Sequence, residues 1–239
     1  MVTLGFVSGT LIEYPDLRNR TGGFKDRAAA GKQLAGMMSE LAGPPPIVLG
    51  IPAGGIPVAV EVARALHCEL DVAGASKITL PDNAEVGCGA VAFDGSVEYN
   101  APLIRHVGLS DDTVKQRVQE TVDKVRRRMD RLRGDAPFPD LTERTVILVD
   151  DGLASGFTLK TAVKAIRRLG PAVLIVAVPT GHAETIARVL PHVKELYCAN
   201  IRTGWRFAVA DAYKNWYDVS EEETAAVLEA FRKRERAKA

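Results

Sequence analysis

The second half of the chain alternates short apolar runs with longer amphipathic stretches, and this alternation constrains the fold more than any other feature. The apolar runs lie at 145–149, 172–178 and 193–199, and each is short enough to be a strand buried on both faces. The stretches between them, 158–169 and 182–190, have the apolar spacing of helices. Strands joined by helices in this way form parallel sheets with right-handed crossovers. The sequence therefore predicts an α/β fold.

The first half of the chain extends the same pattern. With 239 residues, the protein is long enough for one large domain with a substantial core. We expect a single domain over 1–239, with a core at about 24–200 and a doubly wound, mostly parallel sheet of five strands between two layers of helices. The elements expected before residue 145 are a helix at 24–42, a strand at 47–50, a helix at 58–66, a strand at 69–75 and a helix at 111–133.

Residues 76–101 differ from the rest of the chain. Glycines and prolines are scattered there among short alternating pieces, and Asp94-Gly95 suits a hairpin turn. We interpret the segment as a long loop that contains a β-hairpin. Loops of this length in compact domains are usually either functional lids or disordered.

The charge balance gives no indication of a nucleic-acid or membrane-surface partner. The chain has 31 Lys and Arg against 30 Asp and Glu, a net charge of +1. The helix expected at 111–133 ends in a basic run, but Glu120, Asp123 and Asp130 are interleaved with it, so we interpret it as a solvated helix face. No apolar run approaches the roughly 18 residues of a membrane span, and no basic segment precedes an apolar core at the start. We therefore expect a cytoplasmic protein.

Two adjacent aspartates follow the apolar run at 145–149. Because the strands of an open parallel sheet end at its ligand-binding edge, we expect Asp150-Asp151 to lie there. Residues 152–156 are small enough for backbone N–H groups to close around a phosphate, and the next helix turns its positive N-terminus toward the anion. The hydroxyls of Ser155 and Thr158 add donors. The segment lacks the features of a Walker A loop and of a dinucleotide fingerprint, so it predicts a phosphate site of another kind.

A second loop of small residues supports this prediction. Residues 50–57 follow one expected strand and precede a helix, so their backbone amides should face the same edge of the sheet. Taken alone, Gly54-Gly55 is more typical of a plain turn. Together with the acidic pair, it indicates a second anion-binding loop.

Residues 146–158 resemble the motif that binds phosphoribosyl pyrophosphate (PRPP) in type I phosphoribosyltransferases. The chain is similar over almost its whole length to a group of predicted phosphoribosyltransferases, for example at 24–27, 85–95, 176–179 and 216–217. The resemblance implies transfer of phosphoribose from PRPP to a nitrogen acceptor such as a nucleobase, with release of pyrophosphate. It also implies a small hood over the site, made from 1–23, 76–101 and 200–220.

The resemblance further implies a role for each matching residue. Asp150, Asp151 and Lys77 would be catalytic, with the two aspartates on the ribose hydroxyls and the lysine on the pyrophosphate. The residues of the 5-phosphate loop would be Gly152, Ala154, Ser155, Gly156, Phe157 and Thr158. The residues of the pyrophosphate loop would be Pro52, Ala53, Gly54 and Gly55. Mg²⁺ would be held by PRPP, near the aspartates, with no ligand directly from the protein expected. The oligomeric state stays open at this point, with a homodimer as one option, because dimers are the commonest assembly.

Two positions depart from that group. Ala53 stands where arginine is usual, and Ser76-Lys77 stands where arginine-lysine is common. Each change removes a planar donor suited to phosphate. Arg105, Lys25 or Arg27 could supply the missing charge.

Three functions remain open at this point. The first is a phosphoribosyltransferase, the second a non-catalytic regulator that binds PRPP or a nucleotide, and the third a hydrolase of phosphate esters. Five aromatic residues near the C-terminus could either pack a small core or stack on a planar acceptor; they are Trp205, Phe207, Tyr213, Trp216 and Tyr217. The acceptor itself does not follow from the sequence.

Overall fold

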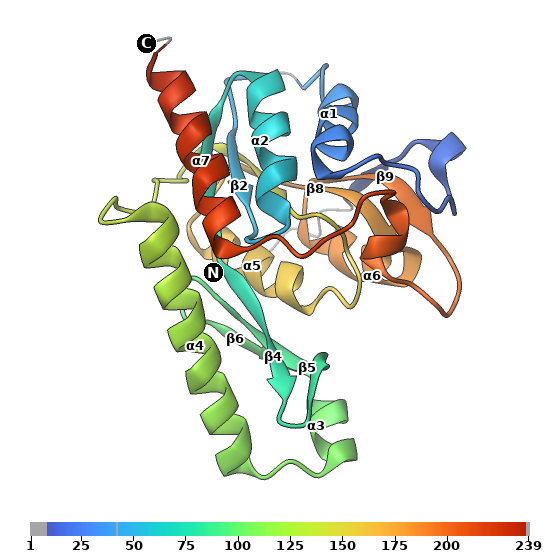
Figure 1. The fold of residues 1–239 in the computed structure, drawn as a ribbon, viewed down its shortest axis with the longest axis vertical. Helices are drawn as coiled ribbons and strands as arrows, with labels where there is room; N and C mark the ends of the chain where they lie inside the picture. Colours follow the sequence, from blue (N-terminus) through green and yellow to red (C-terminus); the bar gives the residue numbers. More distant parts are fainter. Residues whose placement is uncertain (1–8, 42, 238–239) are drawn as a thin grey trace, which may run out of the picture.

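The computed structural model describes residues 9–41 and 43–237 (Figure 1). The first eight residues of the expected hood lie outside this part of the chain. A six-stranded sheet forms the centre of the protein, and every strand pair in it is parallel. Its strands, in spatial order, are β1 (Thr10–Ile12), β9 (Glu195–Arg202), β8 (Val173–His182), β7 (Thr145–Val149), β2 (Ile47–Gly50) and β3 (Glu69–Val72). The expected doubly wound α/β fold is confirmed.

Helices cover both faces of this sheet. One layer contains α5 (Phe157–Arg168) and α6 (Ala183–Val189), and the other contains α1 (Arg27–Met37), α2 (Gly55–Leu66) and α7 (Glu221–Arg236). The strand β7 shows why the central strands are uniformly apolar. Val146 and Leu148 pack on the α5 side, whereas Ile147 and Val149 pack on the α2 side. A strand buried on both faces has no solvent-facing position for a polar residue.

A second, smaller sheet accounts for most of residues 76–101. Its antiparallel strands are β4 (Ala75–Leu80), β5 (Asn83–Ala92) and β6 (Val97–Tyr99), followed by α3 (Ala101–Val107) and the long helix α4 (Asp111–Arg133). Figure 1 shows this sheet with α3 and α4 extending away from the parallel sheet. The sheet packs against α4, and α5 also contacts its strands. The segment is therefore mostly strand, with the expected hairpin turn at Gly95 (φ 80°).

Gly89 explains why this segment looks like a loop in the sequence. A Cβ atom at Gly89 would overlap the backbone carbonyl of Glu98 on the neighbouring strand. The glycine thus permits close approach of two strands, although glycine is usually taken as a sign of a loop.

Several boundaries and the number of strands differ from expectation. The sheet has a sixth strand, β1, which pairs with β9. The helix expected at 24–42 is shorter at both ends: it begins at Arg27, where the side chain of Asp26 caps it by accepting a hydrogen bond from Ala29 N, and it ends at Met37. The helix α2 begins at Gly55, inside the glycine-rich turn. The strand β8 continues to His182 because its final residues keep pairing with β9. Among the described residues, no helix is both long and apolar enough to cross a bilayer.

Candidate active site

The ends of β2 and β7 bring the two predicted loops together. These strands are direct neighbours, with Gly50 opposite Val149 in the register. A Cβ atom on Gly54 would overlap the carboxylate of Asp151, and one on Gly55 would lie 2.9 Å from the Cα atom of Asp150. The loop expected to bind pyrophosphate (residues 52–55, called the pyrophosphate loop below) therefore packs directly against the acidic pair. Only glycine leaves room for this approach.

The acidic pair lies in a partly buried environment. Asp151 Oδ2 accepts a hydrogen bond from Arg27 Nε at 2.9 Å, and Asp150 Oδ1 accepts one from the backbone N–H of Asp151 at 2.9 Å. Burial, and then the nearby charge of Asp151, raise the pKa of Asp150 well above the ordinary value. Burial also raises the pKa of Asp151, although Arg27 opposes this shift. Two carboxylates thus share one described cation, and hydroxyl donors or added positive charge would stabilise them.

Arg27 links the acidic pair to the C-terminal segment. Its side chain is 6% exposed, and its Nη1 donates to the carbonyl of Tyr217 at 2.8 Å. Its guanidinium lies 3.9 Å from the ring centre of Trp216. Tyr213 adds a hydrogen bond from its hydroxyl to the carbonyl of Asp151 at 2.5 Å. The segment 213–217 is therefore fixed to the strand end that carries the aspartates.

These contacts separate the aromatic residues into two groups. Tyr213, Trp216 and Tyr217 surround Arg27. Phe207 instead packs edge-on against His182, whose Nε2 lies 2.8 Å from the carbonyl of Gly204. Trp205, in the same loop as Phe207, is 87% exposed.

The loop expected to bind the 5-phosphate (residues 152–158, called the phosphate loop below) is attached to β8 and includes the start of α5. The backbone N–H of Leu153 donates to the backbone carbonyl of Thr180 at 2.9 Å, and the backbone N–H of His182 donates to the backbone carbonyl of Leu153 at 2.9 Å. Gly156 has a φ of 79°, which glycine adopts without strain, and it is the N-cap of α5. The first amides of α5 therefore follow the acidic pair after residues 152–156.

A small cavity lies beside this helix start. Positive side chains form part of its wall, because Lys160 and Arg188 line it together with Ser155, Gly156, Phe157, Thr185 and Val189. Thr185 Oγ1 donates to the carbonyl of Ala154 at 2.6 Å and accepts from Arg188 Nη2 at 3.0 Å. These contacts fix the side of the loop that faces α6.

Lys77 lies on β4, opposite Ala90 of β5, and its side chain is exposed. Its charge is one of those that lower the pKa of Lys124 on α4. Among the three residues considered as replacements for arginine at 53, Arg27 lies in the site and already contacts Asp151. Arg105 is exposed on α3, at the far end of the second sheet (Figure 1).

One arginine at the pyrophosphate loop was missed by the sequence analysis. Arg128 of α4 has its Nη1 3.5 Å from the carbonyl of Pro52, and the peptide bond that follows, Pro52–Ala53, is cis. The interpretation of the basic run of α4 as a solvated face therefore does not hold for this residue. The available signal was the spacing of Arg117, Thr121, Lys124 and Arg128, which places them on one helix face. Among the described residues, no three His, Cys, Asp or Glu side chains gather to hold a metal ion.

Comparisons with known proteins agree with this geometry. The model of the phosphoribosyl transferase domain matches residues 24–212. A protein provisionally named as a phosphoribosyl transferase, from two strains of Mycobacterium tuberculosis, is 34% identical over 206 residues, which are 86% of this chain and 46% of that protein. The chain thus spans about half the length of these curated relatives.

A solved structure gives the same result for the fold. The crystal structure of TT1426 from Thermus thermophilus is 32% identical, with a TM-score of 0.68. The match covers 87% of this chain and 98% of that one. The family model spans most of the chain and includes both loops and the acidic pair between them. On these grounds, the chain belongs to the phosphoribosyl transferase family.

Proposed function

We propose that the protein transfers the phosphoribosyl group of PRPP to a nitrogen nucleophile, such as a nucleobase, and releases pyrophosphate. One observation carries this proposal. The phosphate loop and the pyrophosphate loop meet at the ends of two adjacent strands, with Asp150 and Asp151 between them. PRPP has the same order of groups: a phosphate, a diol-bearing sugar and a pyrophosphate.

The reaction exchanges one bond at C1 of the ribose for another. The nitrogen lone pair forms a bond to C1, and the bond between C1 and the pyrophosphate oxygen breaks. The electron pair of that bond leaves with pyrophosphate, and the proton of the nitrogen is released to water. Positive charge therefore grows on the sugar while negative charge grows on the leaving group. The protein accelerates the reaction by stabilising both charges.

Asp150 and Asp151 would orient the sugar. Their carboxylates are desolvated, and Arg27 is the one described cation that contacts the pair. Hydroxyl groups of the ribose would donate hydrogen bonds to the remaining carboxylate oxygens. The same negative charge would favour the oxocarbenium-like transition state next to it. A neutral site would lack both effects.

A Mg²⁺ ion fits this arrangement. The raised pKa of each aspartate shows that the pair would gain from a further positive charge. Asp150 and Asp151 would lie near the ion, while oxygens of PRPP would supply most of its ligands. When bound, Mg²⁺ would offset the negative charge of the pyrophosphate.

The phosphate loop would hold the other end of PRPP. Its backbone amides at the start of α5, with the hydroxyls of Ser155 and Thr158, would donate to the 5-phosphate. Residues 200–220 and the second sheet would form the hood that shields the sugar from water. Aromatic residues of the 213–217 segment are attached to Asp151 through Arg27, and in this proposal they would lie near the acceptor.

A regulator that binds PRPP without turnover is the second candidate. The observation in its favour is that the side chains of the pyrophosphate loop, Pro52 to Gly55, carry no charge. Loss of leaving-group stabilisation would reduce catalysis more than binding.

The test is an assay of pyrophosphate release with PRPP, Mg²⁺ and a panel of nucleobases. Release that depends on both PRPP and a base supports the transferase. Binding of Mg-PRPP without any turnover supports the regulator, and phosphate release from other esters without PRPP supports a hydrolase. In a transferase, the double variant Asp150→Asn/Asp151→Asn should abolish release while the protein stays folded by circular dichroism. Unchanged release in this variant would refute the proposed site.

A further inference from the structure

One face of α4 points toward the site described above. Arg117, Thr121, Lys124 and Arg128 are spaced by four, three and four residues, so they share this face. At one end, Arg117 donates from Nε to the carbonyl of Thr79 at 3.1 Å and from Nη2 to its hydroxyl at 2.7 Å. Arg117 therefore ties this face to β4, the strand that carries Lys77, while the neighbouring apolar residues Val118, Val122 and Val125 pack on the second sheet.

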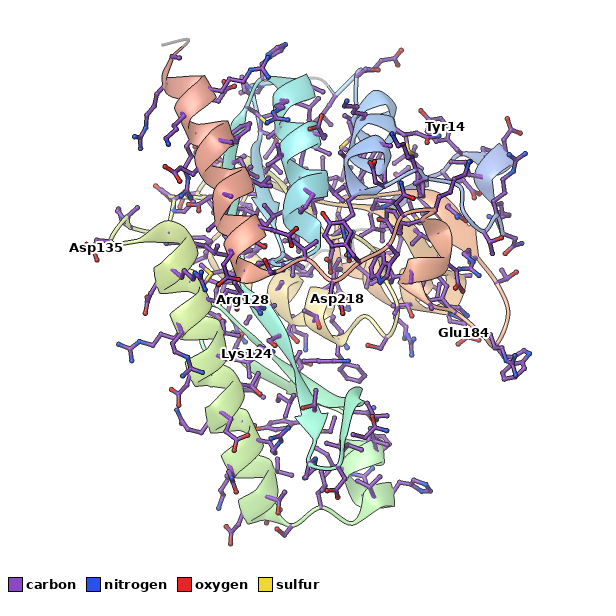
Figure 2. The ribbon with its side chains drawn as sticks, in the orientation of Figure 1. Tyr14, Lys124, Arg128, Asp135, Glu184 and Asp218 are labelled. Carbon is purple, nitrogen blue, oxygen red and sulfur yellow. The ribbon has the colours of Figure 1, made fainter. Side chains whose placement is uncertain are left out.

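The other end of the face reaches the pyrophosphate loop. Arg128 is 14% exposed at its side chain, with Nη1 at the Pro52 carbonyl and Nε donating to Glu221 at 2.8 Å. Glu221 is the first residue of α7. Arg128 is thus fixed between the loop and the start of the C-terminal helix. Figure 2 shows Lys124 and Arg128 on the side of α4 that faces the rest of the protein.

Lys124 lies one helical turn before Arg128 and is accessible to solvent. Its pKa is lowered by partial desolvation and then by the charges of Arg128 and Lys77, while Glu221 raises it. Two cations, Arg128 and Lys77, therefore lie close enough to Lys124 to lower its pKa, and the carboxylate of Glu221 opposes them. Cations gathered in this way repel each other, and a bound polyanion relieves that repulsion.

The pyrophosphate loop has no charge of its own to offer. Its side chains are those of proline, alanine and two glycines, so its contribution to anion binding is limited to backbone amides. Arg128 contacts this loop, and Lys124 lies near both Arg128 and Lys77. These side chains can therefore supply the positive charge for anion binding that the loop lacks.

We infer that Lys124 and Arg128 of α4, together with Lys77, bind the pyrophosphate group of the substrate. This inference rests on the proposed function and adds binding residues to it. Lys124 contributes an accessible point charge, and Arg128 keeps it beside the loop. When the C1–O bond breaks, the negative charge that develops on pyrophosphate lies next to these side chains. They would therefore stabilise the leaving group as well as bind it.

The experiment measures binding of Mg-PRPP, Mg-pyrophosphate and ribose 5-phosphate by isothermal titration calorimetry. The test variant is Lys124→Met, which keeps the length of the side chain and removes its charge. The control is Lys115→Met, which makes the same change on the same helix at a 77% exposed side chain. We expect Lys124→Met to weaken binding of Mg-PRPP and Mg-pyrophosphate by about tenfold or more and to leave ribose 5-phosphate unchanged. Lys124→Arg should retain most of the affinity.

Each other result has a definite meaning. Equal pyrophosphate affinity in the wild type and in Lys124→Met would overturn the inference. Equal weakening of all three ligands would also overturn it, because the effect would not be specific to pyrophosphate. A wild-type protein that binds Mg-pyrophosphate but not PRPP, with loss in Lys124→Met, would refute the proposed function and support the anion site. Equal melting temperatures of the variants would show that the fold is intact.

Discussion

Arg27 Nε lies 2.9 Å from Asp151 Oδ2, although 124 residues separate them in the chain. Both side chains are largely shielded, at 6% and 16% exposure. The guanidinium also holds the carbonyl of Tyr217, so one side chain connects the start of α1, the end of β7 and the C-terminal segment. An ion pair in this position matters mainly because the loss of either partner would leave an unpaired charge in a buried environment.

Replacing Arg27 with methionine should therefore destabilise the protein strongly. The change leaves the Asp151 carboxylate without its cation and removes the stacking partner of Trp216. Loss of one partner of a buried pair typically costs about 3–5 kcal/mol, and we expect a value near the lower end because Asp151 can take up a proton. Urea unfolding at pH 7 measures this cost.

The matched control for this prediction is Arg18→Met. Arg18 forms a comparable ion pair with Glu13, but its side chain is 45% exposed. Removing an exposed pair should change the unfolding free energy very little. Similar losses in the two variants would show that burial is not the reason for the importance of Arg27.

The acidic pair predicts an unusual dependence of stability on pH. The folded state raises the pKa of Asp150, so above the ordinary aspartate value of about 3.9 the folded protein holds a proton that the unfolded chain has released. Stability contributed by this group is therefore complete at low pH and falls as the pH rises toward the folded-state pKa. A pKa that is higher by one in the folded state than in the unfolded state lowers the stability at neutral pH by about 1.4 kcal/mol.

Asp150→Asn should remove this penalty. The variant should unfold at higher urea concentration than the wild type at pH 7, and the difference should shrink as the pH approaches 4. Its activity should be lost, which is the usual cost of stabilising a functional site. A constant difference across the pH range would mean that the charge of Asp150 is not the cause.

The sequence predicted the acidic pair and both loops well because their signals are local. An apolar strand, two aspartates and a run of small residues lie within 145–156, and burial of β7 on both faces made the strand unmistakable. The geometry brings Asp150, Asp151, Gly54 and Gly55 together as expected. The assigned roles of these residues remain predictions.

The second sheet and the basic face of α4 could not be predicted in the same way. Glycines such as Gly89 resemble loop residues unless the facing strand is known. The 3.6-residue period of a helix shows which of its residues share a face. It does not show which of the polar faces is covered by another part of the protein. The surroundings of Lys124 and Arg128 are formed by Lys77 of β4 and by Pro52, and Pro52 lies 76 residues from Arg128 in the chain. Such partners are set by tertiary packing alone.

Gly54→Ala should disrupt the site with a single methyl group. The added Cβ atom would overlap the Asp151 carboxylate and approach Arg27 Nε to 3.3 Å. Either the pyrophosphate loop or Asp151 must move, so binding of Mg-PRPP should fall by at least tenfold. Calorimetric titration measures the loss.

Gly36→Ala is the appropriate control for that substitution. Gly36 lies within α1, where an added Cβ atom would come no closer than 3.8 Å to the nearest atom, the hydroxyl oxygen of Tyr14. Alanine in a helix interior is more stable than glycine by about 0.5–1 kcal/mol, so this variant should be stabilised and keep its affinity. Retained affinity in Gly54→Ala would show that the loop does not need to approach the aspartates closely.

An arginine at position 53 tests which residues supply the positive charge that binds pyrophosphate. Ala53 adjoins Pro52, whose carbonyl contacts Arg128, so Ala53→Arg places a new cation beside the proposed pyrophosphate site. If Lys124 already supplies this charge, the substitution should tighten Mg-pyrophosphate binding only slightly in the wild type and restore much of the affinity lost in Lys124→Met. Such coupling between two substitutions is measured by a double-mutant cycle of the four dissociation constants. Independent effects would mean that the two positions do not contact the same anion, and the new arginine would then be acting at a separate site.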